Sequence, residues 1–127
     1  MTADTADTAD LLARAAAFAR DVVVPSAAAW ERERRVAREA IRAAAALGLC
    51  AIETPVAHGG LGRPFSVKAR VCETLAGADF AFAFSLVNTG NVANKLAREA
   101  APDVAARWVP ALLAGRAIGC TAVSYTH

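Results

Sequence analysis

The chain has 127 residues, a hydrophobic fraction of 56%, a charged fraction of 20% and a formal net charge of +2. This length and composition fit one globular domain with a single core. About a quarter of the residues are alanine, which favours helices that pack closely while burying little side-chain area. Arginine and glutamate alternate over residues 31–42, a mixed-charge face that argues against a nucleic-acid-binding protein.

Neither a membrane span nor a secretory signal is expected. The longest apolar stretch, 43–52, is far shorter than the ~20 residues that cross a bilayer. The N-terminus repeats Thr-Ala-Asp up to Asp10 and lacks the basic region and apolar run of a signal peptide, which predicts a cytoplasmic protein. The repeat also lacks an apolar face, so residues 1–10 are expected to form a disordered leader.

The three cysteines, Cys50, Cys72 and Cys120, lie far apart among apolar residues. Their odd number and wide spacing argue against both a disulfide framework and a zinc site. We expect all three to be buried free thiols.

A first helix is predicted after the leader. Asp10 is placed to cap its N-terminus, and apolar residues recur at helical spacing until Pro25 interrupts the pattern. Ser26 can restart helical structure through Trp30, with a bend near Val36.

A second helix and an ordered loop follow. Ala37–Leu47 is alanine-rich with a helical apolar face, and Gly48 stands where a left-handed C-cap commonly sits. Thr54-Pro55 and then 58–62, which reads His-Gly-Gly-Leu-Gly, supply a cluster of helix breakers. The glycines have neither dinucleotide-binding nor P-loop spacing, so a structural turn is predicted. No second ligand stands near His58, which is therefore expected on the surface and not on a metal.

Two further stretches show the helical period. Ser66 can cap a helix that ends near 77–79. Phe80, Phe82 and Phe84 alternate with alanine, as they would in a strand, but the stretch also fits one face of a helix. We predict a helix. The three phenylalanines and Trp108 are expected in the core.

The last helix opens at Pro102 and closes at Gly115. From Ile118 the sequence is β-rich without helical period, which predicts the beginning of a strand. The predicted fold is therefore all-α, an Ala-rich bundle of about five helices over residues 11–117, with the start of a strand over 118–127.

Chemistry-bearing groups are sparse. The remaining histidine is the terminal residue, His127, where little structure can orient it as a base for a serine or cysteine nucleophile, so a hydrolase is rejected. Glu73 and Asp79 fall on different faces around a helix end, and are interpreted as a solvated surface residue and a cap.

The order of short motifs along the chain resembles the N-terminal helical domain of acyl-CoA dehydrogenases. The resemblance covers nearly all residues from Leu11. It is carried by the succession of Leu47-Gly48-Leu49, Glu53-Thr54-Pro55 with the glycines of 59–62, Glu73-Thr74-Leu75-Ala76 with Asp79, and the run from Trp108 to Arg116.

This resemblance implies a flavoprotein oxidoreductase that binds FAD between a following β-domain and its helical parts. It implies α,β-dehydrogenation of an acyl-CoA thioester, in which a carboxylate removes the α-proton and the β-hydride passes to the flavin. It also implies a homo-oligomer in the complete enzyme. The family's base lies in the C-terminal bundle, so no catalytic residue is assigned within this chain. The chain by itself is expected to be inactive.

The resemblance also implies cofactor-binding residues at the C-terminus. Thr121, Ala122, Val123 and Ser124 align with the first half of a strand that faces the flavin, with Ser124 at the position of a threonine. A frayed tail is the alternative reading of these four residues. Residues 125–127, Tyr-Thr-His, then replace the expected Glu-Pro and Gly-Ser-Asp turn.

This departure predicts a truncated or frame-shifted gene product, in which another reading frame past Ser124 encodes the missing residues. Two alternatives stay open. The domain can belong to a related flavin monooxygenase or nitroalkane-oxidising enzyme, or the chain can be a stand-alone helical module that binds another protein.

Overall fold

The computed structural model describes residues 2–124. Within them the α-helices are α1 (Thr2–Phe18), α2 (Val24–Glu33), α3 (Arg38–Ala46), α4 (Phe65–Ala78), α5 (Phe80–Glu99) and α6 (Pro102–Leu113). A π-helical turn, Ala19–Val23, joins α1 to α2 without a break, so these elements make five helical segments. The predicted all-α bundle is confirmed.

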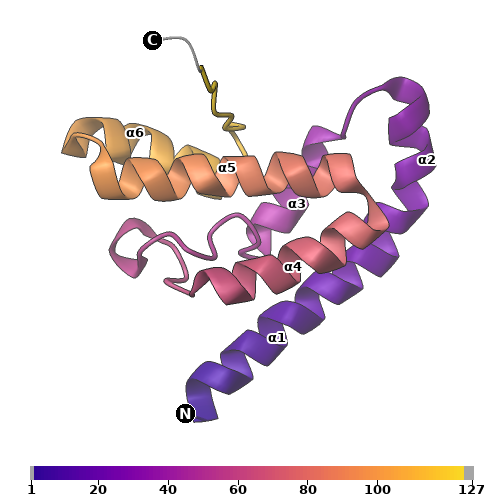
Figure 1. Cartoon of the computed structure of the whole chain (residues 1–127), viewed down its shortest axis with the longest axis horizontal. Coiled ribbons are helices and arrows are strands. Elements are labelled where there is room, and N and C mark those ends of the chain that lie inside the picture. Colours follow the sequence, from indigo (N-terminus) through magenta and orange to yellow (C-terminus); the bar gives the residue numbers. More distant parts are fainter. Residues whose placement is uncertain (1, 125–127) are drawn as a thin grey trace.

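Helices α4 and α5 lie side by side in the bundle. Helix α5 packs against α4 and against α6, and α1 runs along α4 on the other side, as Figure 1 shows. The chain after α6 leaves the bundle beside α5 (Figure 1). The strand expected from Ile118 is not present, because residues 118–124 have no regular secondary structure and the described residues contain no neighbouring strand to pair with them.

The Thr-Ala-Asp repeat differs from the disordered leader expected over residues 1–10. Helix α1 begins at Thr2, and Asp10 therefore lies inside the helix and does not cap it. The repeat is one-third alanine, the residue with the highest helix propensity. A missing apolar face did not prevent a helix here, because the helix continues into a well-packed segment.

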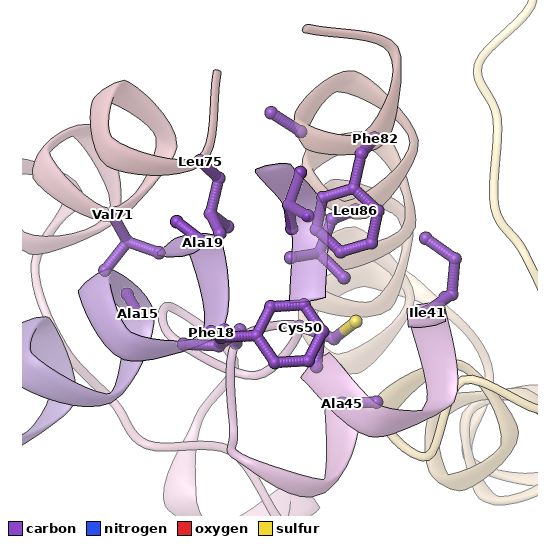
Figure 2. Packing of buried hydrophobic residues seen from close by; sticks show 14 of the residues in the cluster. Ala15, Phe18, Ala19, Ile41, Ala45, Cys50, Val71, Leu75, Phe82 and Leu86 are labelled. Carbon is purple, nitrogen blue, oxygen red and sulfur yellow. The ribbon is translucent and has the colours of Figure 1, made fainter. Parts of the chain in front are cut away.

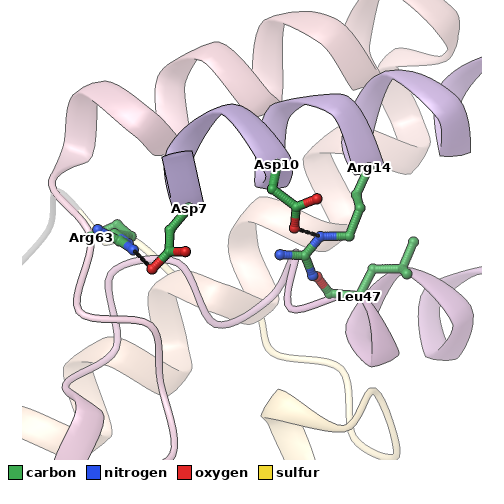
Figure 3. A network of polar contacts seen from close by, with 5 residues as sticks. All are labelled: Asp7, Asp10, Arg14, Leu47 and Arg63. Carbon is green, nitrogen blue, oxygen red and sulfur yellow. Dashed lines mark hydrogen bonds and ion pairs between the residues drawn. The ribbon is translucent and has the colours of Figure 1, made fainter. Parts of the chain in front are cut away.

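Polar contacts tie α1 to the loop between α3 and α4. Asp7 Oδ2 lies 3.1 Å from an Arg63 guanidinium nitrogen, and Asp10 Oδ2 lies 3.0 Å from Arg14 Nε (Figure 3). Arg14 also donates from Nη1 to the carbonyl oxygen of Leu47 at 2.8 Å. The last contact fixes the C-terminal end of α3 against α1.

Pro25 does not end the first helix. It lacks a backbone N–H and cannot complete the bond to the carbonyl four residues earlier. The chain accommodates this with the wider π turn, in which the Val24 N–H reaches the carbonyl oxygen of Ala19. Helical structure then continues through α2 and stops at Arg34, which has a left-handed conformation with φ of 52°.

The core is centred on Phe82 of α5, whose side chain is fully buried. Its ring stacks on Phe18 of α1, with centroids 5.8 Å apart, and on Trp30 of α2, with centroids 5.5 Å apart. Figure 2 shows Phe82 and Leu86 beside Ile41 and Cys50, which come from the α3 side. One ring therefore joins three helices.

The other aromatic residues expected in the core lie elsewhere. Phe80 is 71% exposed and Phe84 is 57% exposed, and their rings stack on each other with centroids 5.7 Å apart. Trp108 on α6 is 43% exposed. Only Phe82 of the three phenylalanines faces inward, because the i, i+2, i+4 spacing places one member on the opposite side of the helix from the other two.

Truncating Phe82 tests this arrangement. We expect Phe82→Ala to lower the free energy of unfolding by about 3–5 kcal/mol, since it leaves a cavity between three helices. Phe84→Ala is the matched control and should cost less than about 1 kcal/mol, because that ring is exposed. Urea unfolding followed by far-UV circular dichroism measures both; equal losses would contradict the placement of the core.

Candidate functional site

The segment that carries the predicted cofactor residues begins at the end of α6. Gly115 adopts a left-handed conformation with φ of 69°, as its position after the helix predicted. A Cβ there would lie 3.0 Å from the Cα of Arg42, so α6 ends in close contact with α3. Arg38 of α3 then donates to the carbonyl oxygen of Arg116 at 2.9 Å.

The segment next contacts α5. The backbone N–H of Gly119 donates to Thr89 Oγ1 at 3.2 Å, and both residues are buried. The same hydroxyl donates to the carbonyl oxygen of Ser85 at 2.9 Å. A hydroxyl can donate once while accepting another hydrogen bond, so Thr89 serves both its own helix and the segment. Sequence reasoning missed this residue, because an isolated threonine in a helical period carries no signal.

Beyond this contact the four predicted cofactor residues are all exposed. Thr121, Ala122, Val123 and Ser124 extend from the bundle with no regular secondary structure. Thr121 and Ala122 line one side of an open hollow of about 400 Å³, whose other side is formed by α5. The predicted departure at residues 125–127 lies outside the described residues.

The wall that α5 contributes to this hollow combines an apolar floor with a charged rim. Val92 and Leu96 provide aliphatic surface, and Lys95 forms an ion pair with Glu99, Nζ to Oε2 at 2.7 Å. An exposed pair of this kind contributes little to stability. The hollow can therefore accept a mainly apolar group with polar edges.

The glycine-rich loop is a structural turn, as predicted. Its amide groups are used internally: Leu61 N–H donates to the Ala51 carbonyl at 2.9 Å, and Gly62 N–H to that of Thr54 at 2.9 Å. A Cβ on Gly60 would lie 1.9 Å from the Thr54 carbonyl oxygen, so only glycine fits. Amides already paired in this way do not form a phosphate cradle.

A family model for the acyl-CoA dehydrogenase N-terminal domain matches residues 5–116. The chain belongs to this family. The match covers most of the helical bundle and includes Gly48, Gly60 and Gly115. Comparison with curated proteins gives no match. The four predicted cofactor residues lie beyond the matched range.

In this acyl-CoA dehydrogenase N-terminal domain, an ion pair holds the loop before α4. Lys68 of α4 forms an ion pair with Glu53 of the loop and donates to Asn91 Oδ1 of α5 at 2.8 Å. Both charged side chains are largely buried. Glu53 belongs to a motif singled out in the sequence, but its contact with Lys68 was not predicted, because Lys68 lies 15 residues further along the chain.

The other predicted residues of the domain are placed as follows. Asp79 caps α5, since its Oδ1 accepts the Phe82 N–H at 2.6 Å, while Glu73 is exposed on α4. His58 is exposed on a short 3-10 turn, Val56–His58. Across the described part of the chain, no three His, Cys, Asp or Glu side chains are grouped to hold a metal ion, and no helix is both long and apolar enough for a bilayer.

The cysteines only partly follow the prediction of buried thiols. Cys50 is buried, and burial raises the pKa of its thiol to about 12. Cys72 is partly buried, and burial is also the main cause that raises its pKa. Cys120 is exposed, because it follows Gly119 at the point where the chain leaves the bundle. None of the three is a disulfide partner.

An exposed apolar surface lies on α4 and α5. We call it the phenylalanine surface; it consists of Phe65, Phe80 and Phe84, all more than half exposed, with Val87 and the partly buried Cys72 beside them. A hollow of about 410 Å³ lies among them. Leu49, Ile52 and Leu112 are buried and do not extend this surface.

The phenylalanine surface should bind hydrophobic dyes and promote self-association. We expect the double variant Phe80→Ser/Phe84→Ser to lose most of the 8-anilinonaphthalene-1-sulfonate fluorescence of the chain, and to scatter less light at high concentration. Val24→Ser is the control, because Val24 is 58% exposed but lies on α2. Dye binding that is absent in the unmodified chain, or unchanged in the double variant, would refute this expectation.

Proposed function

We propose that this domain serves a flavin-dependent acyl-CoA dehydrogenase, as the N-terminal helical part of an enzyme that introduces an α,β double bond into an acyl-CoA thioester. The observation that supports this most directly is the family match over residues 5–116 together with the exit of the chain beside α5. In this proposal residues 118–124 lead from the helices toward the flavin. The electrons of the reaction pass to FAD, which supplies the redox chemistry when bound.

The C-terminal residues fit one edge of a flavin site. Thr121 and Ser124 carry hydroxyls, and residues 121–124 are exposed next to the open hollow against α5. A planar ring needs such polar partners at its edge and apolar walls on its faces. The described residues provide a single wall. We therefore propose that Thr121, Ala122, Val123 and Ser124 hold the flavin from one side only.

From this one-sided fit we expect the chain alone not to retain FAD. A site that lacks most of its contacts cannot offset the entropy lost when the cofactor is fixed. The measurement is the flavin absorbance of protein purified in the presence of added FAD and then passed through a desalting column. A stoichiometric flavin spectrum after this step would contradict the expectation.

The function itself is tested by fusion. Residues 1–124 are joined to the β-domain and C-terminal bundle of an acyl-CoA dehydrogenase of established activity, which has lost its own N-terminal domain. We expect a yellow protein that reduces an artificial electron acceptor when a suitable acyl-CoA is added. The same partner domains without residues 1–124 are the control. A helical, soluble fusion that binds no flavin and oxidises no acyl-CoA would overturn the proposal.

Within this fusion, the role of Ser124 has its own test. Ser124→Val should weaken FAD binding about fivefold, the equivalent of one hydrogen bond of about 1 kcal/mol. Ser124→Thr should retain binding, because it keeps the hydroxyl. Ser66→Val is the matched control, since Ser66 is an exposed serine in the first turn of α4. Equal FAD affinity in all variants would remove Ser124 from the flavin site.

A second candidate is a helical module that binds another protein, and the phenylalanine surface favours it. An apolar area of this kind on an isolated domain needs a covering partner. The fusion experiment separates the two candidates. The interaction module predicts no flavin in the fusion, whereas the dehydrogenase domain predicts a flavoprotein.

A further inference from the structure

The chain between α6 and the cofactor segment is held at successive points. Gly115 contacts α3 at the end of α6, and the Arg116 carbonyl accepts from Arg38. Three residues later Gly119 donates to Thr89 at the middle of α5. After Gly119 every described residue is exposed. The Thr89 contact is therefore the last buried one before the segment that the proposed function places at the flavin.

The fit at this last contact leaves little freedom. Thr89 has no exposed surface, and the Gly119 amide is buried with it. A buried amide that loses its partner costs free energy comparable to a lost hydrogen bond, so the pair opposes displacement of the segment. Steric packing adds to this effect, because a Cβ on Gly119 would lie 2.7 Å from the Cβ of Val92.

The side chain of Thr89 is also restricted to few orientations. Its hydroxyl is oriented by donation to the Ser85 carbonyl in the preceding turn, which leaves a lone pair for Gly119. As a β-branched residue inside a long helix it has few rotamers available. The Thr89 Oγ1 atom, which accepts from Gly119, is therefore held in position by its own helix.

We propose that Thr89 is a positioning residue for the cofactor segment: by holding the Gly119 amide, it sets where Cys120 to Ser124 leave the helical domain toward the flavin. This inference rests on the proposed function for the flavin role. The hydrogen bond from Gly119 to Thr89, which we call the tether, is a property of the chain and can be measured without any cofactor.

The test uses the full chain and amide hydrogen exchange measured by NMR. Thr89→Val keeps the shape of the side chain and removes the acceptor. We expect the Gly119 amide to exchange about fivefold faster or more, and residues 120–124 to gain fast motion in heteronuclear relaxation. Thr89→Ser should restore the protection of the unmodified chain. Amides elsewhere in α5, such as that of Ala93, should change much less.

The control is Thr74→Val, because Thr74 also donates to a carbonyl four residues earlier, that of Arg70, but lies on α4, whereas the Gly119 amide donates to Thr89 of α5. If Thr74→Val loosens residues 119–124 as much as Thr89→Val, the effect is general destabilisation and the proposal fails. It also fails if the Gly119 amide of the unmodified chain exchanges as fast as an unstructured amide.

A second pair of variants keeps the proposal testable if Thr89→Val does not fold. Gly119→Ala should displace the segment, because of the contact with Val92, and accelerate exchange at 119–124. Gly77→Ala is its control, since a Cβ there meets nothing within 4 Å. The proposal fails if exchange at residues 119–124 is accelerated in both alanine variants, or in neither. A fusion protein without flavin would instead overturn the proposed function and leave these exchange results standing.

Discussion

The stacking of Phe82 between Phe18 and Trp30 is the interaction on which the rest of the domain depends. It fixes α5 against both halves of the long N-terminal helical segment, and α4 and α6 in turn pack on α5. Alanine is the most frequent of the other buried hydrophobic residues, and small side chains allow helices to approach closely but contribute little burial each. A few large side chains must therefore determine how the helices are arranged.

The sequence predicts most of the helices, and the errors have local causes. Gly48 and Gly115 were identified correctly as helix ends, because a left-handed residue after a helix has a strong residue preference. The disordered leader was wrong, because the lack of an apolar face hid a helix that a neighbouring packed segment extends. The exposed Phe80 and Phe84 were misplaced because hydrophobicity alone does not say which side of a helix meets the core.

The candidate site was predicted less completely. Motif order led to the family, which the match over residues 5–116 confirms, and to a segment near the C-terminus. The groups that hold this segment come from elsewhere in the chain: Thr89 is 30 residues away from Gly119. A hydrogen bond over such a separation has no periodic signature, so only the folded arrangement shows it. The same is true of the contact between Lys68 and Asn91.

The π-helical turn has a consequence for how the domain can vary in length. It holds more residues than an α-helical turn, so it changes the rotational phase between α1 and α2. Removing one residue between Ala19 and Val23 would force an α-helical turn, which Pro25 opposes, and would rotate everything after it by about 100° around the helix axis. Trp30 would then face away from Phe82. The packing of the core therefore fixes the length of this helical segment, and insertions or deletions are better tolerated in the turn that follows it at Arg34.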